Sequence, residues 1–491
     1  MYSQKFIKSS NRKSIIFISV IIIFAFFVGV YIAGGISYIS KLTNIFIPSD
    51  INPIYSRLIL LFGVLFCLVI FLKPRLGLYF IAGYVPIQFG IRDLFGGSKF
   101  YGLADDLVLI VVILSIISRI LIYRESIPKN PVNLPFLLLI TWGFFSAIVN
   151  MINISAAVQG LRVLIEPFAF YYSILFLCRK EDTYKPLLLV FFILSVIQLP
   201  IQLIQLNKYY GISPDLITGS LGTGFANTLG YFQSISLFLS IGLYHQRKSV
   251  GSGLLILLFI ISIVLSSARF LFFFLPVAIF IIHRPIKSVI KNNKNIIQLF
   301  IFLSIIVLIL FTSIYVFEGK VWSRSLTYWL NLKRLIRVQF NTEENMGRIG
   351  YFFELFDQLS DFRLLTGLGP LMWGSKPASF DYSPLYRKVV SGNLTNTIPS
   401  QFIVVIGEYG LIGVLLYMVI FIRIYLSNKN KTLIYYLEYK RILGFALNGA
   451  LLLFIVGASI QNLWFNQVTS YYFWVVVAGV LSKNLFAKKG I

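Results

Sequence analysis

The chain has 491 residues, of which 58% are hydrophobic, 16% aromatic and only 12% charged. This composition excludes an ordinary soluble domain, because such a domain has no place for so many long apolar runs. The 43 Lys and Arg against 18 Asp and Glu give a formal net charge of +25. Most basic residues stand between apolar runs, which is typical of membrane topology rather than of a nucleic-acid surface.

Fourteen apolar runs predict transmembrane helices, since about 17 to 25 residues cross ~30 Å of hydrocarbon. The first run follows a basic N-terminal segment and has no small-residue cleavage site, so we expect a retained helix. The predicted fold is an all-α polytopic membrane protein with about 14 transmembrane helices. The spans are predicted near residues 14–34, 57–72, 76–91, 103–123, 134–150, 157–178, 186–206, 225–245, 252–267, 269–283, 297–317, 399–422, 442–460 and 468–482.

The connections between spans alternate in charge. If the N-terminus is cytoplasmic, every cytoplasmic connection is basic, from Arg75 to Lys488, and the short outward connections hold few basic residues. Both termini are then predicted to be cytoplasmic. The chain divides into eleven spans over residues 1–317, a large periplasmic loop over residues 318–398, and three spans over residues 399–491. A large hydrophilic loop outside the membrane indicates chemistry or capture rather than simple conduction.

Arg162 and Glu166 form an ionisable pair inside a predicted span. They stand four residues apart, so they share one helix face. A charge in the membrane is costly and therefore suggests a function. Two interpretations stay open: a mutually neutralised structural pair, or an Arg162 that faces a water-filled cavity and holds an anionic substrate while Glu166 orients it.

Two more arginines are predicted on the outer side of the membrane. Arg269 falls at a tight turn between two short spans, where snorkelling alone would account for it. Arg348 opens a segment of the outer loop in which apolar residues recur at near-helical spacing as far as Leu359. This pattern predicts an amphipathic helix on the membrane surface or over a cavity, and a solvated Arg348 is the plainer alternative. Arginine suits phosphate because its planar fork bonds two oxygens and stays charged, so these residues indicate a lipid-phosphate site.

Glu408 lies about three turns into the span that follows Pro399, among apolar neighbours. A desolvated carboxyl suits a general base, and pairing with an arginine is the alternative. Glu343, Glu344 and Asp381 in the outer loop are further candidates for the base.

Several functional signals are absent from the sequence. It contains no P-loop, dinucleotide-binding glycine pattern, Cys/His cluster or Ser/His/Asp set, so no nucleotide, metal or other cofactor is predicted. Cys67 and Cys178 fall inside apolar runs and are interpreted as small buried residues. The glycine-rich stretch over residues 221–230 is interpreted as a place of close helix packing rather than a phosphate loop.

Four stretches together resemble the O-antigen polymerase and ligase superfamily. They are GLRVLIEPF with Arg162, SSAR with Arg269, the outer-loop run from Arg348 through LLTGLGP, and IPSQFIVVIGEYGLIGVLLY with Glu408. The resemblance implies a GT-C-like glycosyltransferase fold that acts on the periplasmic side on sugars carried by undecaprenyl pyrophosphate. It also implies that Arg162, Arg269 and Arg348 bind pyrophosphate or acceptor groups. From the residues themselves, Glu166 is predicted to belong to the same binding site, and Glu408 and Arg348 are predicted to act in catalysis.

One departure favours a polymerase over a ligase. Where the ligases have a His, this chain has Pro399 followed by Ser400. We therefore expect a metal-independent polymerase of the bacterial inner membrane that moves a growing glycan from undecaprenyl pyrophosphate onto the next lipid-linked repeat unit. Its product would be an O-antigen, a capsule or an exopolysaccharide. The expected partners are the undecaprenyl-pyrophosphate-linked oligosaccharide, the lipid bilayer and a chain-length regulator protein, and no nucleic acid.

Two alternatives to a polymerase remain. A ligase would transfer the glycan to lipid A core or to a protein. A lipid-linked-oligosaccharide flippase would need charges along a central cavity and pseudo-symmetric halves, whereas the charges here concentrate at the outer ends of spans. A secondary transporter is a more distant alternative.

Overall fold

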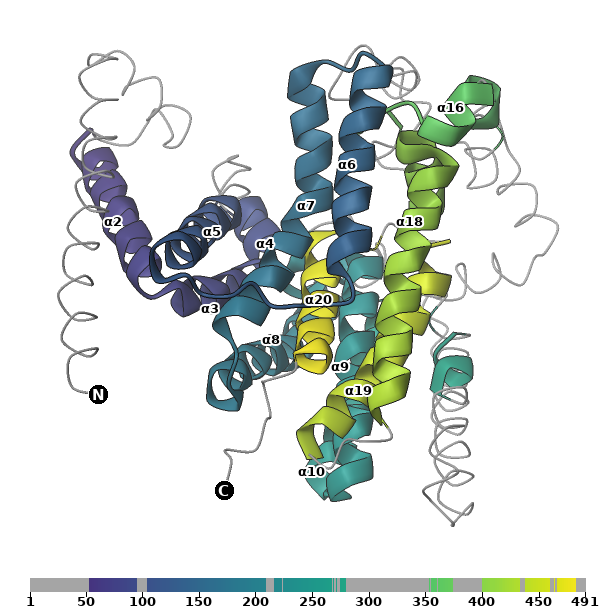
Figure 1. Ribbon diagram of the computed structural model, residues 1–491. Coiled ribbons are helices and arrows are strands. Elements are labelled where there is room, and N and C mark those ends of the chain that lie inside the picture. The colour runs from purple at the N-terminus through teal and green to yellow at the C-terminus, as the bar shows by residue number, and fades with distance from the viewer. Residues whose placement is uncertain are drawn as a thin grey trace, which may run out of the picture. The chain divides into compact units, whose positions relative to one another are not determined.

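The computed structural model of the protein describes residues 53–94, 104–208, 216–222, 224–266, 268, 271, 274–279, 353, 355–359, 361–373, 400–432, 438–459, 463 and 466–482. Within these residues the regular structure is helical, and no strand occurs among them (Figure 1). The predicted all-α class is therefore confirmed for the described part of the chain.

Five described helices are long and apolar enough to cross a membrane, and one bent pair would give a sixth. A helical membrane protein is supported by this finding. The total of about 14 spans and the GT-C-like arrangement stay predictions. The predicted spans near residues 14–34 and 297–317 lie outside the described residues, and that near 269–283 is described only in part.

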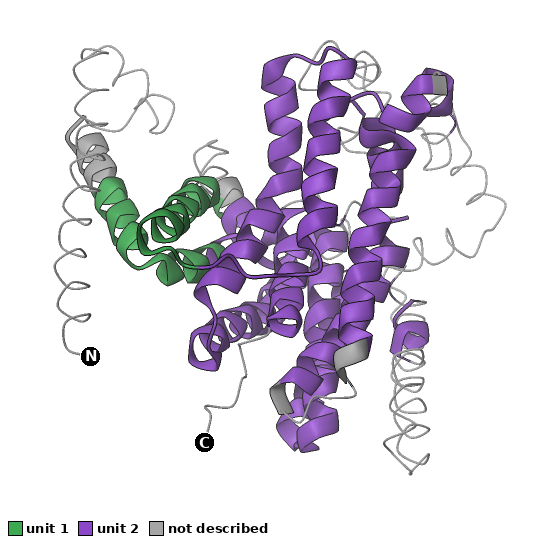
Figure 2. Ribbon diagram, viewed as in Figure 1, with its two compact units in different colours: residues 1–81, 91–125 green, residues 82–90, 126–491 purple. Residues whose placement is uncertain are grey.

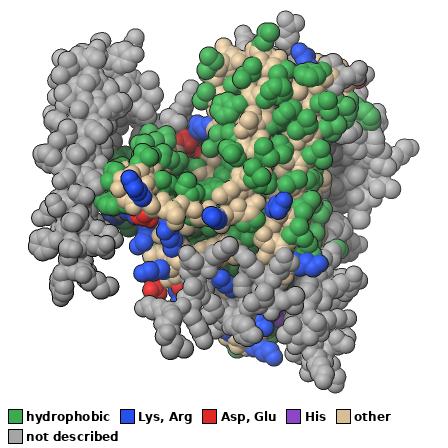
Figure 3. Space-filling model, viewed as in Figure 1, with side chains coloured by type: hydrophobic (Ala, Val, Ile, Leu, Met, Phe, Trp, Pro, Cys, Tyr) green, Lys and Arg blue, Asp and Glu red, His purple; other side chains and the backbone are tan. Residues whose placement is uncertain are grey.

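The exposed face of α6 (Asn133–Val149) is mostly apolar. Leu134, Leu137 and Ile148 are exposed on this helix, and Figure 3 shows hydrophobic side chains gathered over this part of the molecule. Water would penalise such a surface, whereas lipid chains would cover it. The exposed face of α6 thus fits a membrane environment.

Most predicted spans agree with the observed helices to within a few residues. Helix starts coincide with side-chain caps: Asn153 accepts from the Ser155 backbone N–H, and Ser249 accepts from that of Ser252. The agreement covers α5 (Ala104–Tyr123), α6, α7 (Ile154–Leu177), α8 (Glu181–Lys208), α9 (Ala226–Arg247), α10 (Val250–Leu265), α19 (Glu438–Gly457) and α20 (Gln467–Leu481).

The second and third predicted spans differ from the structure. α2 (Pro53–Leu72) and α3 (Pro74–Tyr84) are bent by 119° where they meet, so they form a broken span or a re-entrant loop. The span predicted over residues 76–91 is wrong, because α3 ends at Tyr84 and α4 (Gln88–Leu94) begins after a turn. Pro86 lies in that turn, where its ring and missing N–H prevent a continuous helix.

The chain divides into two compact units, residues 1–81 with 91–125 and residues 82–90 with 126–491 (Figure 2). In the first unit α2 packs against α5, and Ser115 Oγ donates a hydrogen bond of 2.7 Å to the Phe71 carbonyl. This bond satisfies a carbonyl just before the bend. The first unit is thus held by a polar contact as well as by apolar packing.

The second unit is built around α20, in which every residue from Val468 to Leu481 is buried. α7, α9 and α19 contact it. α9 also packs closely on the chain after α10, since a Cβ on Gly230 would lie 2.4 Å from the Ala268 Cβ. The close packing predicted for the glycine-rich stretch is therefore confirmed at Gly230.

Candidate functional site

The Arg162–Glu166 pair lies on α7 as its spacing predicts. Arg162 Nε is 3.7 Å from Glu166 Oε2, and the two side chains are 43% and 7% exposed. The two charged groups thus differ in exposure: the carboxylate is nearly buried, and the guanidinium beside it is partly exposed. Pro167 follows Glu166 inside α7 and cannot donate to the Val163 carbonyl one turn before it.

Two side chains of α20 reach the same carboxylate from the other side. Gln467 Nε2 and Tyr471 OH donate to Glu166 Oε1 at 2.7 and 2.6 Å. The two donors are four residues apart and so share one face of α20. The side chain of Asn466 caps this helix by accepting from the Thr469 N–H.

The network continues to a third helix and is braced by an aromatic contact. Gln88 Nε2 donates to Gln467 Oε1 at 2.7 Å, and the Tyr471 ring stacks on Phe170 with centroids 4.6 Å apart. We call Gln88, Arg162, Glu166, Gln467 and Tyr471 the Glu166 cluster. Hydrogen bonds from neutral donors and a nearby cation can together hold an ionised carboxylate in a low-dielectric interior.

A second region surrounds Glu408, whose side chain is 1% exposed. Glu408 lies in α18 (Gln401–Thr432), which is broken at Gly410, with φ 67° and ψ −170°. The span predicted over residues 399–422 is therefore both longer than expected and kinked. Carbonyls that end a helical stretch have no donor one turn ahead, and in a membrane they need protein partners.

The partners of these carbonyls come from elsewhere in the chain. The backbone N–H groups of Leu368 and Gly369 donate to the Gly407 and Glu408 carbonyls at 2.7 and 3.1 Å. Trp142 Nε1 on α6 donates to the Tyr409 carbonyl at 2.9 Å. The break in α18 is therefore closed by backbone and side-chain donors from two other segments.

Residues 366–373 begin at the last residue of α16 (Asp361–Thr366), and we call them the return segment. Ser146 Oγ on α6 donates to the Thr366 carbonyl at 2.7 Å and lies 3.2 Å from the Glu408 carbonyl. Asn150 Nδ2 donates to the Gly367 carbonyl at 3.0 Å. α6 thus holds the return segment and α18 together.

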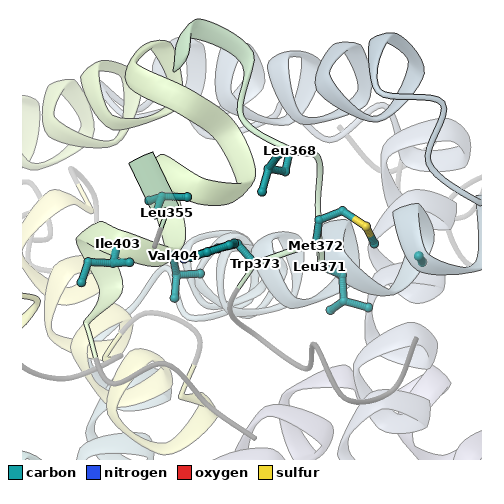
Figure 4. Close-up of a cluster of buried hydrophobic side chains, with 8 residues drawn as sticks. Leu355, Leu368, Leu371, Met372, Trp373, Ile403 and Val404 are labelled. Atoms are coloured by element: carbon teal, nitrogen blue, oxygen red, sulfur yellow. The ribbon is translucent and has the colours of Figure 1, made fainter. Parts of the chain in front are cut away.

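Apolar side chains complete this second region. Trp373 is fully buried, and Figure 4 shows it beside Val404, with Leu371 and Met372 next to it. These residues belong to a stretch that the sequence assigns to a large polar loop. The described residues of that loop include a buried part, because its apolar residues Leu368, Leu371, Met372 and Trp373 cluster with the start of α18.

Helix α7 links the two regions. A Cβ on Gly160 would lie 2.7 Å from the Pro370 Cβ, so the return segment packs directly on this helix. Gly160 and Arg162 are about 200° apart around α7, so the return segment and the Glu166 cluster occupy different sides of it. The structure therefore places Glu166 and Glu408 in two separate regions, and α7 contacts both.

Other predicted site residues lie outside the described part of the chain. They are Arg269, Arg348, Glu343, Glu344 and Asp381. The sequence prediction missed Gln88, Gln467 and Tyr471. The polar run Asn466, Gln467, Thr469 and Ser470 at the start of an apolar helix was the signal that could have found part of this set.

Comparison of the chain with protein families and with curated proteins finds no match.

Proposed function

We propose that the protein is a bacterial surface-polysaccharide polymerase of the O-antigen polymerase type. It would sit in the inner membrane with both termini in the cytoplasm, and it would transfer the growing glycan from undecaprenyl pyrophosphate onto the next lipid-linked repeat unit. The order of the four stretches in the sequence and the helical membrane character of the described residues support this proposal.

The Glu166 cluster is the observation that carries the proposal. A guanidinium that remains 43% exposed beside a nearly buried carboxylate can take an anionic group on its open side. The carboxylate fixes the orientation of the guanidinium and offsets part of its charge. Such an arrangement suits the pyrophosphate of a lipid-linked glycan, which approaches from the membrane.

The transfer needs positioning and charge stabilisation more than a cofactor. A hydroxyl oxygen of the acceptor sugar attacks the anomeric carbon, the bond from that carbon to the pyrophosphate oxygen breaks, and the hydroxyl proton passes to a base. Arg162, with Arg269 and Arg348, would bind the leaving pyrophosphate, and Glu408 would receive the proton. Undecaprenyl pyrophosphate is the leaving group, so no nucleotide takes part.

Purified full-length protein, given only undecaprenyl-pyrophosphate-linked repeat units, tests this function. We expect longer glycans and released undecaprenyl pyrophosphate without nucleotide, lipid A core or added divalent metal. Arg162→Ala should abolish lengthening, and Arg162→Lys should restore little of it because Lys lacks the two-pronged fork. Translocation without lengthening would indicate a flippase, and a need for an added acceptor would indicate a ligase; either result would overturn the proposal.

A further inference from the structure

Both donors from α20 bond one oxygen of the Glu166 carboxylate. Gln467 and Tyr471 reach Oε1, whereas Arg162 Nε is 3.7 Å from Oε2. An ionised carboxylate offers about four acceptor positions on its two oxygens. The two neutral donors therefore bond Oε1, and Oε2 is the oxygen that lies near the Arg162 guanidinium.

The orientation of the Gln467 amide follows from this bond. An ionised carboxylate only accepts hydrogen bonds, so Gln467 must present its N–H to Glu166 and its oxygen to Gln88. Gln88 is 1% exposed, so this end of the network is also closed to solvent. The amides thus form a directed chain of donors that ends at the carboxylate.

We propose that Tyr471 and Gln467 are positioning residues that fix the Glu166 carboxylate in place and so hold the Arg162 guanidinium ready for a lipid-linked pyrophosphate. This inference rests on the proposed anion-binding role of Arg162. The two donors fix the plane of the carboxylate, because both bond Oε1 from α20. A carboxylate that rotates away from this position would no longer orient the cation beside it.

A purely structural role would have a different signature. Tyr471 and Gln467 also join α20 to α7, so their loss could weaken helix packing alone. That effect would lower stability without depending on Arg162. A positioning role instead requires that the loss of affinity act through Arg162.

The test uses the full-length protein in nanodiscs, with undecaprenyl pyrophosphate as the probe and the lipid-linked repeat unit as substrate. Tyr471→Phe removes the hydroxyl and retains the ring that stacks on Phe170. Gln467→Leu removes both amide bonds. Because hydrogen bonds to charged groups are strong, we expect each variant to bind the probe about tenfold more weakly. KM should rise by a similar factor and kcat should change less than about threefold.

The chain offers a matched control for each change. Tyr472 is the next residue on α20; it is equally buried, and its hydroxyl donates to the Ala82 carbonyl. Gln202 is a fully buried glutamine whose amide donates to the Ser262 carbonyl at 2.9 Å. Tyr472→Phe and Gln202→Leu should lower stability comparably and leave probe affinity within about twofold. Equal losses of affinity in the controls and in the Tyr471 and Gln467 variants would overturn the inference.

A double-mutant cycle between Arg162→Ala and Tyr471→Phe decides the mechanism. If Tyr471 acts through Arg162, its change should have no further effect on probe affinity once Arg162 is removed. Additive losses, or unchanged affinity in Tyr471→Phe alone, would overturn the positioning role and leave the proposed function standing. Unchanged affinity in Arg162→Ala alone would overturn the anion site itself and this inference with it.

Discussion

Two buried glutamates lie within the described helices of the second unit, and they are accommodated in different ways. Side chains surround the Glu166 carboxylate, with Gln467, Tyr471 and Arg162 within 3.7 Å. Around Glu408, the bonds described above go to the backbone, where the return segment and α6 satisfy carbonyls at the break in α18. A network of side-chain donors stabilises and orients a charged group, whereas bonds to backbone carbonyls hold a chain segment in one conformation. The side-chain network of the first region suits the binding of an anion, and the backbone bonds of the second region fix the return segment against the helix that carries Glu408.

The largest expected effect comes from replacing Gly410, whose positive φ allows the break in α18. In Gly410→Ala, the new Cβ would lie 2.2 Å from the Leu365 carbonyl oxygen, and φ is 67°. The substitution should lower the free energy of unfolding by at least about 3 kcal/mol, because strain and a clash with backbone add. SDS titration of the purified protein in mixed micelles measures this change.

Gly251→Ala is the control for that substitution. Gly251 lies in α10 with nothing within 4 Å of the added Cβ, so the change should be neutral or should stabilise by up to about 1 kcal/mol. Equal stability of Gly410→Ala and the wild type would mean that α18 can straighten at no cost. The return segment would then not depend on the break.

The sequence predicts the first region better than the second, for a physical reason. Arg162 and Glu166 lie in one helix, and the spacing of four residues reveals their pairing without tertiary information. Gln88 and Gln467 lie far from Glu166 along the chain, so only the folded structure brings Gln467 to the carboxylate and Gln88 to Gln467. Apolar periodicity likewise gives most helix bounds but not the bend between α2 and α3.

The break at Gly410 shows why the second region could not be predicted. The stretch GEYGLIG is compatible with an unbroken apolar helix, since single glycines are tolerated there. The break is stabilised by donors from residues 142, 368 and 369, and no local pattern encodes those contacts. The loop residues Leu371 and Trp373 look like part of a polar connection until their buried packing is known.

Removal of the negative charge from the first region should lower stability less than Gly410→Ala does, and it should lower polymer formation strongly. In Glu166→Gln, the amide oxygen can still accept from Tyr471 and Gln467, but Arg162 loses its anionic neighbour. We expect the free energy of unfolding to fall by about 2 kcal/mol, reduced from the value for a fully buried pair because Arg162 is 43% exposed. Polymer length on gels of extracted polysaccharide should fall much more. A stable variant with normal polymer would reduce this pair to a structural one.

A single hydroxyl tests how much α6 contributes to the second region. Ser146→Ala removes the donor to the Thr366 and Glu408 carbonyls and should cost about 1 to 2 kcal/mol of unfolding free energy. Ser234→Ala is the matched control, because Ser234 is buried but bonds only the Gly230 carbonyl of its own helix among the described bonds. That control should change stability by less than about 0.5 kcal/mol. Equal effects would show that Ser146 does not join the return segment to α18.

The smallest expected effect concerns a second pair of charges four residues apart on a helix. Lys185 Nζ lies 2.8 Å from Glu181 Oε1, closer than Arg162 lies to Glu166, but both side chains are more than a third exposed, at 51% and 41%. Water screens such a pair and competes for its hydrogen bonds, so Lys185→Met should change the free energy of unfolding by about 0.5 kcal/mol or less. The same SDS titration measures it beside Glu166→Gln. If burial and added donors decide the contribution of a charge pair, the longer pair must matter more than the shorter one. If Lys185→Met lowered the free energy of unfolding as much as Glu166→Gln, the distance between the charged atoms would decide the contribution of a pair. Burial and added hydrogen-bond donors would then not distinguish Glu166 from the exposed Glu181.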